Sequence, residues 1–488
     1  MRFSFINPSP NNPLHTTMLN SSPPLGILQI ASVLRRSGVE VSALDQAAEN
    51  LSIDEVVDWV VKEDPDILGI SVLISSSLVA PEIAQEVKKK NPEITIVFGN
   101  HHATFNAERI LAKYPPVDIV VRGEGERTCL ELVDYMRGKK RLKDVLGITF
   151  RHNRRVISTA ELPILKDVDS LPFPARDLLG AVYHNTTIGI NVAPKKFTSI
   201  LSSRGCAFKC RFCSCTSMAH SFWRSRSVGS ILDELHFLES EGYRQLMFVD
   251  DNFTLNQRRV IELCQRMRKD RIDLEWICEG RVDQCSDDML QEMVRAGCRM
   301  IYFGIESANQ EVLDYYGKGI TPAQSERAVV TARRAGMDVI VGSFIVGAPN
   351  ETKEDVQKTL DFAKRLDIDV PQINPLMVNP GTPLWDEFKN GGFLDEELFW
   401  ETGVYASSIV PNAIPLDELI PMIRGYYQNF LKQPRYIAKQ IYLTLKSSYR
   451  LSIVFNNFTR IKTISDSINN LTTDVSASNF STRARIVS

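Results

Sequence analysis

The chain has 488 residues, of which 43% are hydrophobic and 24% are charged, and its formal net charge is −2. This length allows two or three domains with buried cores, and the near-neutral charge does not favour nucleic acid or an anionic membrane as a general partner. No apolar run approaches the roughly 18 to 20 residues that span a bilayer, and the N-terminus predicts a strand rather than a signal peptide. Nine scattered cysteines favour a reducing cytoplasm over a disulfide framework. We therefore expect a soluble cytoplasmic enzyme.

Residues 1–140 alternate short apolar runs with amphipathic helical patterns. Strands are expected at 3–6, 40–44, 67–72, 94–98 and 119–121, and helices at 26–37, 53–62, 80–90 and 128–136. This alternation predicts a doubly wound parallel sheet, which binds ligands at the carboxyl ends of its strands. The turns expected at those ends are rich in Gly, Ser, Asn and His, as in a ligand crevice; they are 7–8, 71–77, 99–102 and 123–126.

The rest of the chain divides into four further segments. Residues 141–195 carry two β-like runs and a proline-containing stretch, and predict a connector. Residues 196–414 contain six further strands, each followed by helix-like sequence; the strands are expected at 198–202, 245–249, 274–278, 300–304, 338–345 and 372–376. Six such units are too few for a closed eight-stranded barrel but fit a partial (β/α)6 barrel. Residues 415–468 predict a basic helical region, and the tail 469–488 is expected to be disordered.

Three cysteines follow the first strand of this second repeat, in the spacing C-x3-C-x2-C. They are Cys206, Cys210 and Cys213, and Phe212 precedes the last of them. Three thiolates can hold three irons of a [4Fe–4S] cluster and leave the fourth iron open to a ligand. An electron-transfer ferredoxin would close that position with a fourth cysteine, and a structural zinc site would show two separated ligand pairs. The spacing also disfavours the alternative of three unrelated buried thiols.

This motif resembles that of the radical S-adenosylmethionine (SAM) enzymes. The resemblance implies that the three cysteines bind the cluster, that SAM chelates the open iron, and that Phe212 packs beside the adenine. It implies further SAM-binding residues at the later strand ends, namely Asp250, Asp251, Glu279, Arg281, Glu306, Gly342 and Gly347. Glu306 is similar to the carboxylate that accepts hydrogen bonds from the ribose hydroxyls in this family. Each of these residues alone could be structural, since strand-end carboxylates often cap helices.

One of these strand ends departs from the common family pattern. Many members have a Gly-Gly-Glu run for the SAM amino group, and residues 250–252 are Asp-Asp-Asn instead. This form resembles that of cobalamin-dependent members, and it leaves open which group holds the ammonium.

The first half resembles the cobalamin-binding domain of a subclass that includes carbon methyltransferases and the anaerobic cyclase of chlorophyll-type pigments. The residues that carry this resemblance are Asn7, Pro24, Gly26, Gly99, His101, His102, Gly123 and Glu124. No Asp-x-His-x-x-Gly motif is present, so His101 and His102 are expected to contact the corrin or its nucleotide tail rather than to ligate cobalt. A dinucleotide-binding domain would need a Gly-x-Gly-x-x-Gly that is missing here. A domain that has lost its cobalamin remains an alternative.

These features lead to the hypothesis of a cobalamin-dependent radical SAM enzyme that modifies an unactivated carbon by methyl transfer. The alternatives are an oxidative cyclase or rearrangement enzyme with the same cofactors, and an iron–sulfur protein of electron transfer or redox sensing. We expect a small-molecule substrate, lipid- or tetrapyrrole-like, and an electron donor such as ferredoxin or flavodoxin. The basic C-terminal helical region could lie on a lipid surface or on a hydrophobic substrate, or it could simply be solvated.

Overall fold

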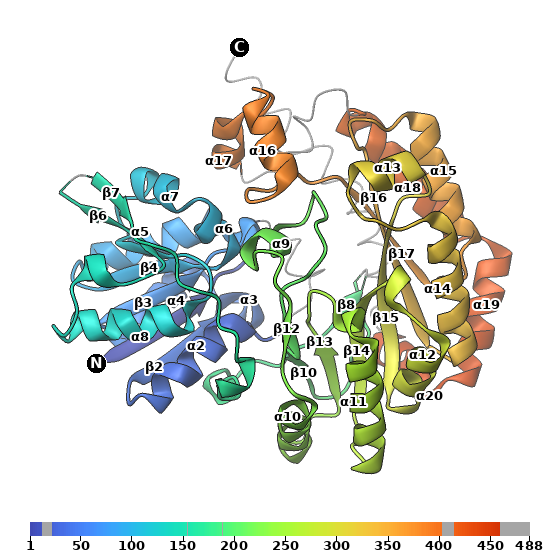
Figure 1. The fold of residues 1–488 in the computed structure, drawn as a ribbon, viewed down its shortest axis with the longest axis horizontal. Coiled ribbons are helices and arrows are strands. Elements are labelled where there is room, and N and C mark those ends of the chain that lie inside the picture. Colours follow the sequence, from blue (N-terminus) through green and yellow to red (C-terminus); the bar gives the residue numbers. More distant parts are fainter. Residues whose placement is uncertain (12–21, 154, 188, 403–413, 459–488) are drawn as a thin grey trace. The chain divides into compact units, whose positions relative to one another are not determined.

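A computed structural model describes residues 1–11, 22–153, 155–187, 189–402 and 414–458, and the chain forms two compact units (Figure 1). The first unit comprises Met1–Tyr183, Ser217–Ser227 and most of helix α17 (Glu396–Thr402), and the second comprises the other described residues. Among the described helices, none is long and apolar enough to cross a membrane. The predicted tail 469–488 lies outside the described residues.

The first unit is built on a seven-stranded sheet in the order β2-β1-β3-β4-β5-β6-β7. Its strands are β1 (Arg2–Asn7), β2 (Glu40–Asp45), β3 (Ile67–Ser71), β4 (Thr95–Gly99), β5 (Ile119–Val121), β6 (Ile148–His152) and β7 (Arg155–Ser158). The first five strands are parallel, which confirms the predicted doubly wound sheet. The predicted connector contributes β6 and β7, which extend the sheet in the antiparallel sense.

The helices of this unit begin and pack as their sequences indicate. They are α2 (Leu25–Arg36), α4 (Ile53–Glu63), α5 (Val79–Lys90), α6 (Asn100–Phe105), α7 (Ala107–Lys113) and α8 (Gly125–Met136). Ser52 and Glu55 form a capping box that satisfies backbone amides at the start of α4. The rings of Phe3 and Phe5 stack at 4.5 Å, and Gly69 makes room for them because an added Cβ would lie 2.8 Å from the Phe5 ring.

The second unit contains six parallel strands in the order β10-β13-β14-β15-β16-β17. They are β10 (Phe197–Ile200), β13 (Gln245–Phe248), β14 (Glu275–Arg281), β15 (Cys298–Glu306), β16 (Val339–Val346) and β17 (Val370–Pro375). All six strands overlap the predicted ranges, and the strand order follows the sequence. The partial (β/α)6 barrel is therefore confirmed.

The core of this unit lies between the strands and the helices outside them. These helices are α10 (Val228–Ser240), α11 (Gln257–Lys269), α12 (Asp287–Arg295), α14 (Pro322–Ala335) and α15 (Lys353–Arg365). Trp276 and Cys278 of β14 pack into this apolar layer, with Phe248 against the Trp276 ring. Because side chains alternate along a strand, Ile277 and Glu279 face the barrel interior instead. The open strand ends thus border an interior that carries polar groups.

Three helices follow the barrel, namely α18 (Leu416–Phe430), α19 (Pro434–Lys446) and α20 (Ser448–Asn457). Buried Asp369 fastens α19 and α20 to the barrel, because its carboxylate lies 2.6 Å from Arg333 of α14, 2.7 Å from Arg450 of α20 and 3.8 Å from Lys439 of α19. Burial alone would raise the pKa of Asp369, but the three cations outweigh burial and lower the pKa. The predicted helical C-terminal region is thereby confirmed as far as residue 458.

Replacing Asp369 with asparagine is expected to destabilise the chain by about 3–5 kcal/mol, because the buried cations lose their anion. The matched control is Asp367→Asn, since Asp367 contacts Arg333 and Lys439 but its side chain is 42% exposed. Exposed ion pairs contribute roughly 1 kcal/mol or less. Urea unfolding curves of both variants measure the difference; equal losses would contradict the account of this network.

Candidate active site

The cysteine loop follows β10 at the carboxyl end of the barrel, and Asp250 fixes its start. Buried Asp250 accepts hydrogen bonds from the Ser202 amide at 2.7 Å and from the hydroxyls of Ser202 and Ser203 at 2.5 Å. Arg259 lies 3.7 Å from the same carboxylate. Burial raises the pKa of Asp250, and Arg259 opposes that rise. The carboxylate of Asp250 is therefore bonded to groups of the chain itself, and these bonds hold the start of the cysteine loop.

The neighbouring carboxylate, Asp251, lies in a different environment. Its side chain is exposed, and one oxygen accepts a hydrogen bond from the Gly205 amide at 2.9 Å. Gly205 has φ +80°, a conformation that favours glycine, immediately before Cys206. Of the two predicted carboxylates, Asp251 is the one that an incoming ligand can reach.

The three predicted cluster thiols share one electrostatic neighbourhood. Burial raises the pKa of Cys206 and of Cys210, and the charge of Cys213 raises both further. The thiol of Cys215 donates a hydrogen bond to Cys213 and lowers the pKa of Cys213 to about 7. Cys215 thus favours the thiolate form of Cys213, an effect that its position two residues beyond Cys213 did not reveal.

The donor set fits a [4Fe–4S] cluster better than it fits a single metal ion. Within the described residues, no three His, Cys, Asp or Glu side chains converge closely enough to hold one ion. Each thiolate of a cubane binds a different iron, so the three ligands need not converge. The site offers three cysteines from one short loop, and it leaves the fourth iron for another ligand.

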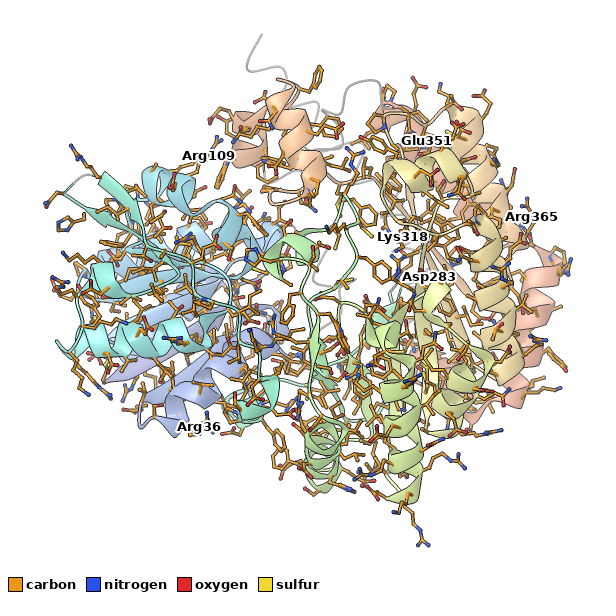
Figure 2. All side chains as sticks on the ribbon, in the orientation of Figure 1. Arg36, Arg109, Asp283, Lys318, Glu351 and Arg365 are labelled. Carbon is orange, nitrogen blue, oxygen red and sulfur yellow. The ribbon has the colours of Figure 1, made fainter. Side chains whose placement is uncertain are left out.

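Arg281 fastens the loop from the end of β14. Its guanidinium lies 3.5 Å from the centroid of the Phe208 ring, and Nη1 is 3.8 Å from Cys210 Sγ. Nη2 donates to the Lys318 backbone oxygen at 2.7 Å, and Nε pairs with Asp283 at 3.0 Å (Figure 2). Arg281 therefore lies at the cysteine loop, where the resemblance implies a cofactor-binding residue, and it links this loop to Lys318 and Asp283.

A buried ion pair joins Lys318 to Glu306 at 2.6 Å. Glu306 ends β15 with φ +63°, a strained conformation for a residue that is not glycine. Gly304 leaves the space for the pair, because an added Cβ would come within 2.6 Å of both charged groups. The sequence did not point to Lys318, although its place between Gly317 and Gly319 was a usable signal for a tightly turned loop.

Glu279 borders the barrel interior beside Tyr302, its partner in the register of β14 and β15. Enclosure by the protein raises the pKa of Glu279 to about 7, and nearby Asp251 adds to the rise while Lys318 opposes it. The side chain itself is exposed, because it faces the open interior, so water moderates the effect of burial. Glu279 is therefore an interior carboxylate whose pKa is raised above the usual value.

The remaining barrel residues of the predicted set are Phe212 in the cysteine loop after β10, Gly342 within β16 and Gly347 just after β16. The Phe212 ring meets the edge of the Tyr316 ring at 5.4 Å. Gly342 packs toward the helical layer, where an added Cβ would lie 3.0 Å from Ile305. Gly347 has φ +88°, and its amide donates to buried Glu351 at 2.6 Å.

Glu351→Gln is expected to flatten the pH dependence of stability. Burial raises the pKa of Glu351 from 4.5 to about 7, so the folded chain keeps a proton that the unfolded chain releases. The stability from this group is complete below about pH 4.5 and is lost as the pH rises through 7. At about pH 8 the variant should gain up to about 3 kcal/mol over the wild type, with no gain at about pH 4. Urea unfolding at several pH values measures the free energy of unfolding of both proteins, with Glu354→Gln, an exposed position, as control. Equal pH dependence of stability in the Glu351→Gln variant and the wild type would contradict this prediction.

In the first unit, the predicted cobalamin residues gather at the carboxyl ends of β1, β4 and β5. Asn7 ends β1 and donates to Asp45 at 3.1 Å. Gly99 ends β4, and Gly123 follows β5 with φ +76°. An added Cβ at Gly99, at Gly123 or at Gly26 in the first turn of α2 would meet no atom within 4 Å. These open strand ends fit a large cofactor, and Pro24 precedes α2 at the same edge.

The two predicted histidines differ sharply. Half-buried His101 lies with Nδ1 2.9 Å from Asn100 Oδ1. His102 is buried against Trp400 of α17, with ring centroids 5.3 Å apart, and burial lowers its pKa to about 4. Within the described chain, neither ring nitrogen of His102 has a hydrogen-bond partner. His102 therefore packs against the aromatic helix, and His101 is the more accessible of the two.

Glu124 is tied to a distant segment of the same unit. Its carboxylate pairs with Arg224, and its second oxygen accepts from the Leu165 amide at 3.2 Å. Arg224 belongs to the stretch Ser217–Ser227, which follows the cysteine loop in sequence. Glu124 thus has a structural role, and its cofactor role stays a prediction.

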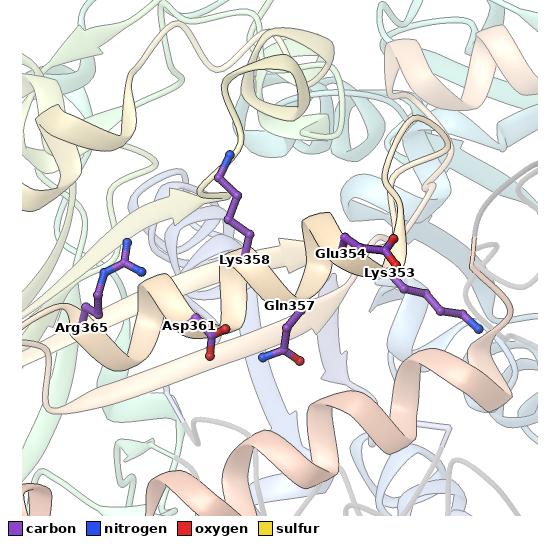
Figure 3. Close-up of a pocket in the computed structure, with 6 residues that line it drawn as sticks. All are labelled: Lys353, Glu354, Gln357, Lys358, Asp361 and Arg365. Carbon is purple, nitrogen blue, oxygen red and sulfur yellow. The ribbon is translucent and has the colours of Figure 1, made fainter.

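A cavity of about 530 Å³ opens on the surface of the second unit (Figure 3). Its lining consists of Lys353, Glu354, Gln357, Lys358, Asp361 and Arg365. All six side chains belong to α15, and none belongs to the predicted site. They form a solvated helix face, so we place no chemistry there.

Comparison with known proteins agrees with this geometry. The sequence matches the family described as the radical SAM superfamily over residues 200–363 and the B12 binding domain over residues 13–133. An uncharacterized methyltransferase of Pyrococcus horikoshii is 34% identical over 91% of this chain and 95% of its own length. The anaerobic magnesium-protoporphyrin IX monomethyl ester cyclase of Cereibacter sphaeroides is 27% identical over 88% of this chain and 70% of its own.

A solved structure also shares the fold. The radical SAM methyltransferase TsrM from Kitasatospora setae, with cobalamin and a [4Fe–4S] cluster bound, aligns with a TM-score of 0.65 at 18% identity, over 80% of this chain and 75% of that one. Fold and site together define an iron–sulfur enzyme that uses SAM. The chain belongs to the radical SAM superfamily, among the members with a B12 binding domain. Its cofactors are accordingly a [4Fe–4S] cluster, SAM and cobalamin.

Proposed function

We propose that this enzyme transfers a methyl group to an unactivated carbon of a small molecule. The observation that carries the proposal is the three-cysteine loop on one chain with a B12 binding domain, together with the relative named as a methyltransferase. When bound, the cluster and SAM supply a carbon-centred radical, and cobalamin supplies a transferable methyl group. The protein supplies the placement of these groups and the exclusion of water.

In this proposal different barrel residues bind the cluster and the parts of SAM. Cys206, Cys210 and Cys213 hold the cluster. Asp251 accepts a hydrogen bond from the SAM ammonium, because its carboxylate is exposed at the strand end. Glu306, oriented by Lys318, accepts from the ribose hydroxyls.

Four further residues complete the barrel site in this proposal. Phe212 and the Gly342–Gly347 segment border the adenine. Glu279 faces the substrate from the barrel interior and can hold or release a proton near neutral pH.

In the first unit, cobalamin would lie along the open strand ends. Gly99 and Gly123 approach it closely, because they leave space at the strand ends, and Asn7 ends the neighbouring strand β1. Pro24, Gly26 and Glu124 border the same edge, and His101 is the histidine placed to contact it. We assign His102 no bond to cobalt, since Trp400 covers it.

The experiment uses SAM that carries a deuterated methyl group, dithionite, and a small-molecule extract of the cells that make the protein. Label in a new product supports methyl transfer. A new unlabelled product would instead favour oxidative cyclisation, the alternative suggested by the relative named as a cyclase. Cleavage of SAM to 5′-deoxyadenosine without any new product in repeated extracts would count against both.

We further propose that the enzyme works in the cytoplasm with a ferredoxin or flavodoxin as electron donor. All nine cysteines are free, which suits a reducing compartment. Replacing dithionite with reduced flavodoxin should sustain 5′-deoxyadenosine formation. A requirement for the chemical reductant with every protein donor would contradict this assignment.

A further inference from the structure

Helix α19 (Pro434–Lys446) is amphipathic in the opposite sense to an ordinary surface helix. Its polar side chains face the barrel, where Tyr436 Oη donates to the Asp369 backbone oxygen at 2.8 Å and Lys439 Nζ to that of Ile368 at 2.9 Å. None of its residues is buried. A surface helix normally buries its apolar side chains and exposes its polar ones.

The outward side of α19 and part of α20 are apolar instead. Ile437, Ile441 and Leu445 recur every four residues along α19, so they form one row on the helix. Leu445 is 72% exposed and Phe455 is 77% exposed. We call the exposed set the C-terminal apolar surface; it consists of Ile437, Ile441, Tyr442, Leu445, Val454, Phe455 and Phe458.

The charged residues of this C-terminal stretch are all basic. From residue 419 to residue 465 the sequence has no Asp or Glu, although the net charge of the whole chain is −2. The basic residues in this stretch are Arg424, Lys432, Arg435, Lys439, Lys446, Arg450, Arg460 and Lys462. Lys439 is paired with Asp367 of the barrel, whereas Lys432, Arg435 and Lys446 are exposed on the same helices as the apolar side chains or next to them in sequence. An apolar face that carries exposed basic side chains complements a surface that is apolar inside and anionic outside.

We propose that the C-terminal apolar surface docks the enzyme on an anionic lipid bilayer. The apolar side chains enter the boundary between headgroups and acyl chains, and the exposed cations face the lipid phosphates. The polar inner face of α19 keeps the helix anchored to the barrel throughout. The docking is peripheral and does not depend on the identity of the carbon substrate.

The charge argues against two other occupants. A second copy of the chain would bring two acid-free, basic surfaces together, at an electrostatic cost. Residues 459–488 also carry more basic than acidic residues, so they do not complement this surface. An anionic bilayer can contact the apolar side chains through its acyl chains and the basic side chains through its phosphates.

The test sediments the full-length, cofactor-loaded enzyme with phosphatidylcholine vesicles, with and without phosphatidylglycerol. We expect binding that needs phosphatidylglycerol and weakens with salt. Ile441→Asp with Leu445→Asp should weaken binding at least tenfold, and Phe455→Ser with Phe458→Ser should also weaken it. The matched control is Val61→Asp with Val330→Asp, which adds the same charge at exposed apolar positions on α4 and α14. It should bind like the wild type.

Several outcomes would overturn the proposal. One is no binding to phosphatidylglycerol vesicles, and another is equal binding by the α19 variant and the control while both remain folded by circular dichroism. A molar mass of two chains that falls to one in the α19 variant would show a second copy on this surface. Hydrogen exchange in α19 that is slow without lipid and fast after removal of residues 459–488 would show that the chain's own end covers it.

Discussion

Replacing Cys213 with serine is expected to abolish dithionite-driven 5′-deoxyadenosine formation, whereas replacing Cys215 with serine should leave most of it. Cys213 is a cluster ligand in our account, and losing one of three thiolates on a short loop removes an iron site that nothing else supplies. The rate should fall by at least about 1000-fold, to the background. Iron and sulfide content and the visible absorption of the cluster provide a second readout.

The comparison between these two cysteines is sharp because they lie two residues apart and share a hydrogen bond. Without the Cys215 thiol, the pKa of Cys213 should rise, so the Cys215→Ser variant should assemble its cluster more slowly at neutral pH. Cys264→Ser serves as a further control, because that thiol is buried in the apolar core. If the Cys215→Ser variant lacked the cluster while the Cys213→Ser variant kept it, the third cluster ligand would be Cys215 and not Cys213.

Replacing Lys318 with methionine is expected to cost about 3–5 kcal/mol of folding stability and to weaken SAM binding. Removing the cation leaves Glu306 as an uncompensated carboxylate at 5% exposure. The carboxylate would also lose the partner that orients it for the ribose hydroxyls. Urea unfolding and equilibrium dialysis with SAM measure the two effects separately.

A double variant distinguishes the two roles of this pair. Lys318→Met with Glu306→Gln removes both charges, so most of the lost stability should return. The affinity for SAM should stay low, because the amide is a weaker acceptor than the carboxylate. If the stability losses of Lys318→Met and Glu306→Gln simply add in the double variant, the two side chains are not coupled as an ion pair. If the double variant binds SAM like the wild type, Glu306 does not accept hydrogen bonds from the ribose.

The sequence predicted the strands of both sheets because their apolar runs are short, regular and separated by clear turns. It also predicted the cysteine loop, since that motif is local. It could not separate Asp250 from Asp251. Which of two adjacent carboxylates turns inward depends on partners such as Ser202, 48 residues away, and these partners are fixed only by tertiary packing.

Long-range packing also decides contacts that the sequence did not reveal. Lys318 comes from a loop after β15, and nothing in its local pattern shows that it meets Glu306. His102 looked like a cofactor contact beside His101, yet it packs under Trp400, a residue almost 300 positions later. Helical periodicity cannot show that α17 returns to the first unit, because that contact is not encoded in neighbouring residues.

The most direct test of the central claim uses the enzyme purified without air and reconstituted with iron, sulfide and hydroxocobalamin. The measurement is dithionite-driven formation of 5′-deoxyadenosine from SAM by protein that retains the corrin absorption after gel filtration. We predict 5′-deoxyadenosine from corrin-bearing enzyme and none from the Cys213→Ser variant. No 5′-deoxyadenosine from protein with a complete cluster would contradict the radical SAM assignment, and its formation by protein that cannot retain corrin would contradict the cobalamin half.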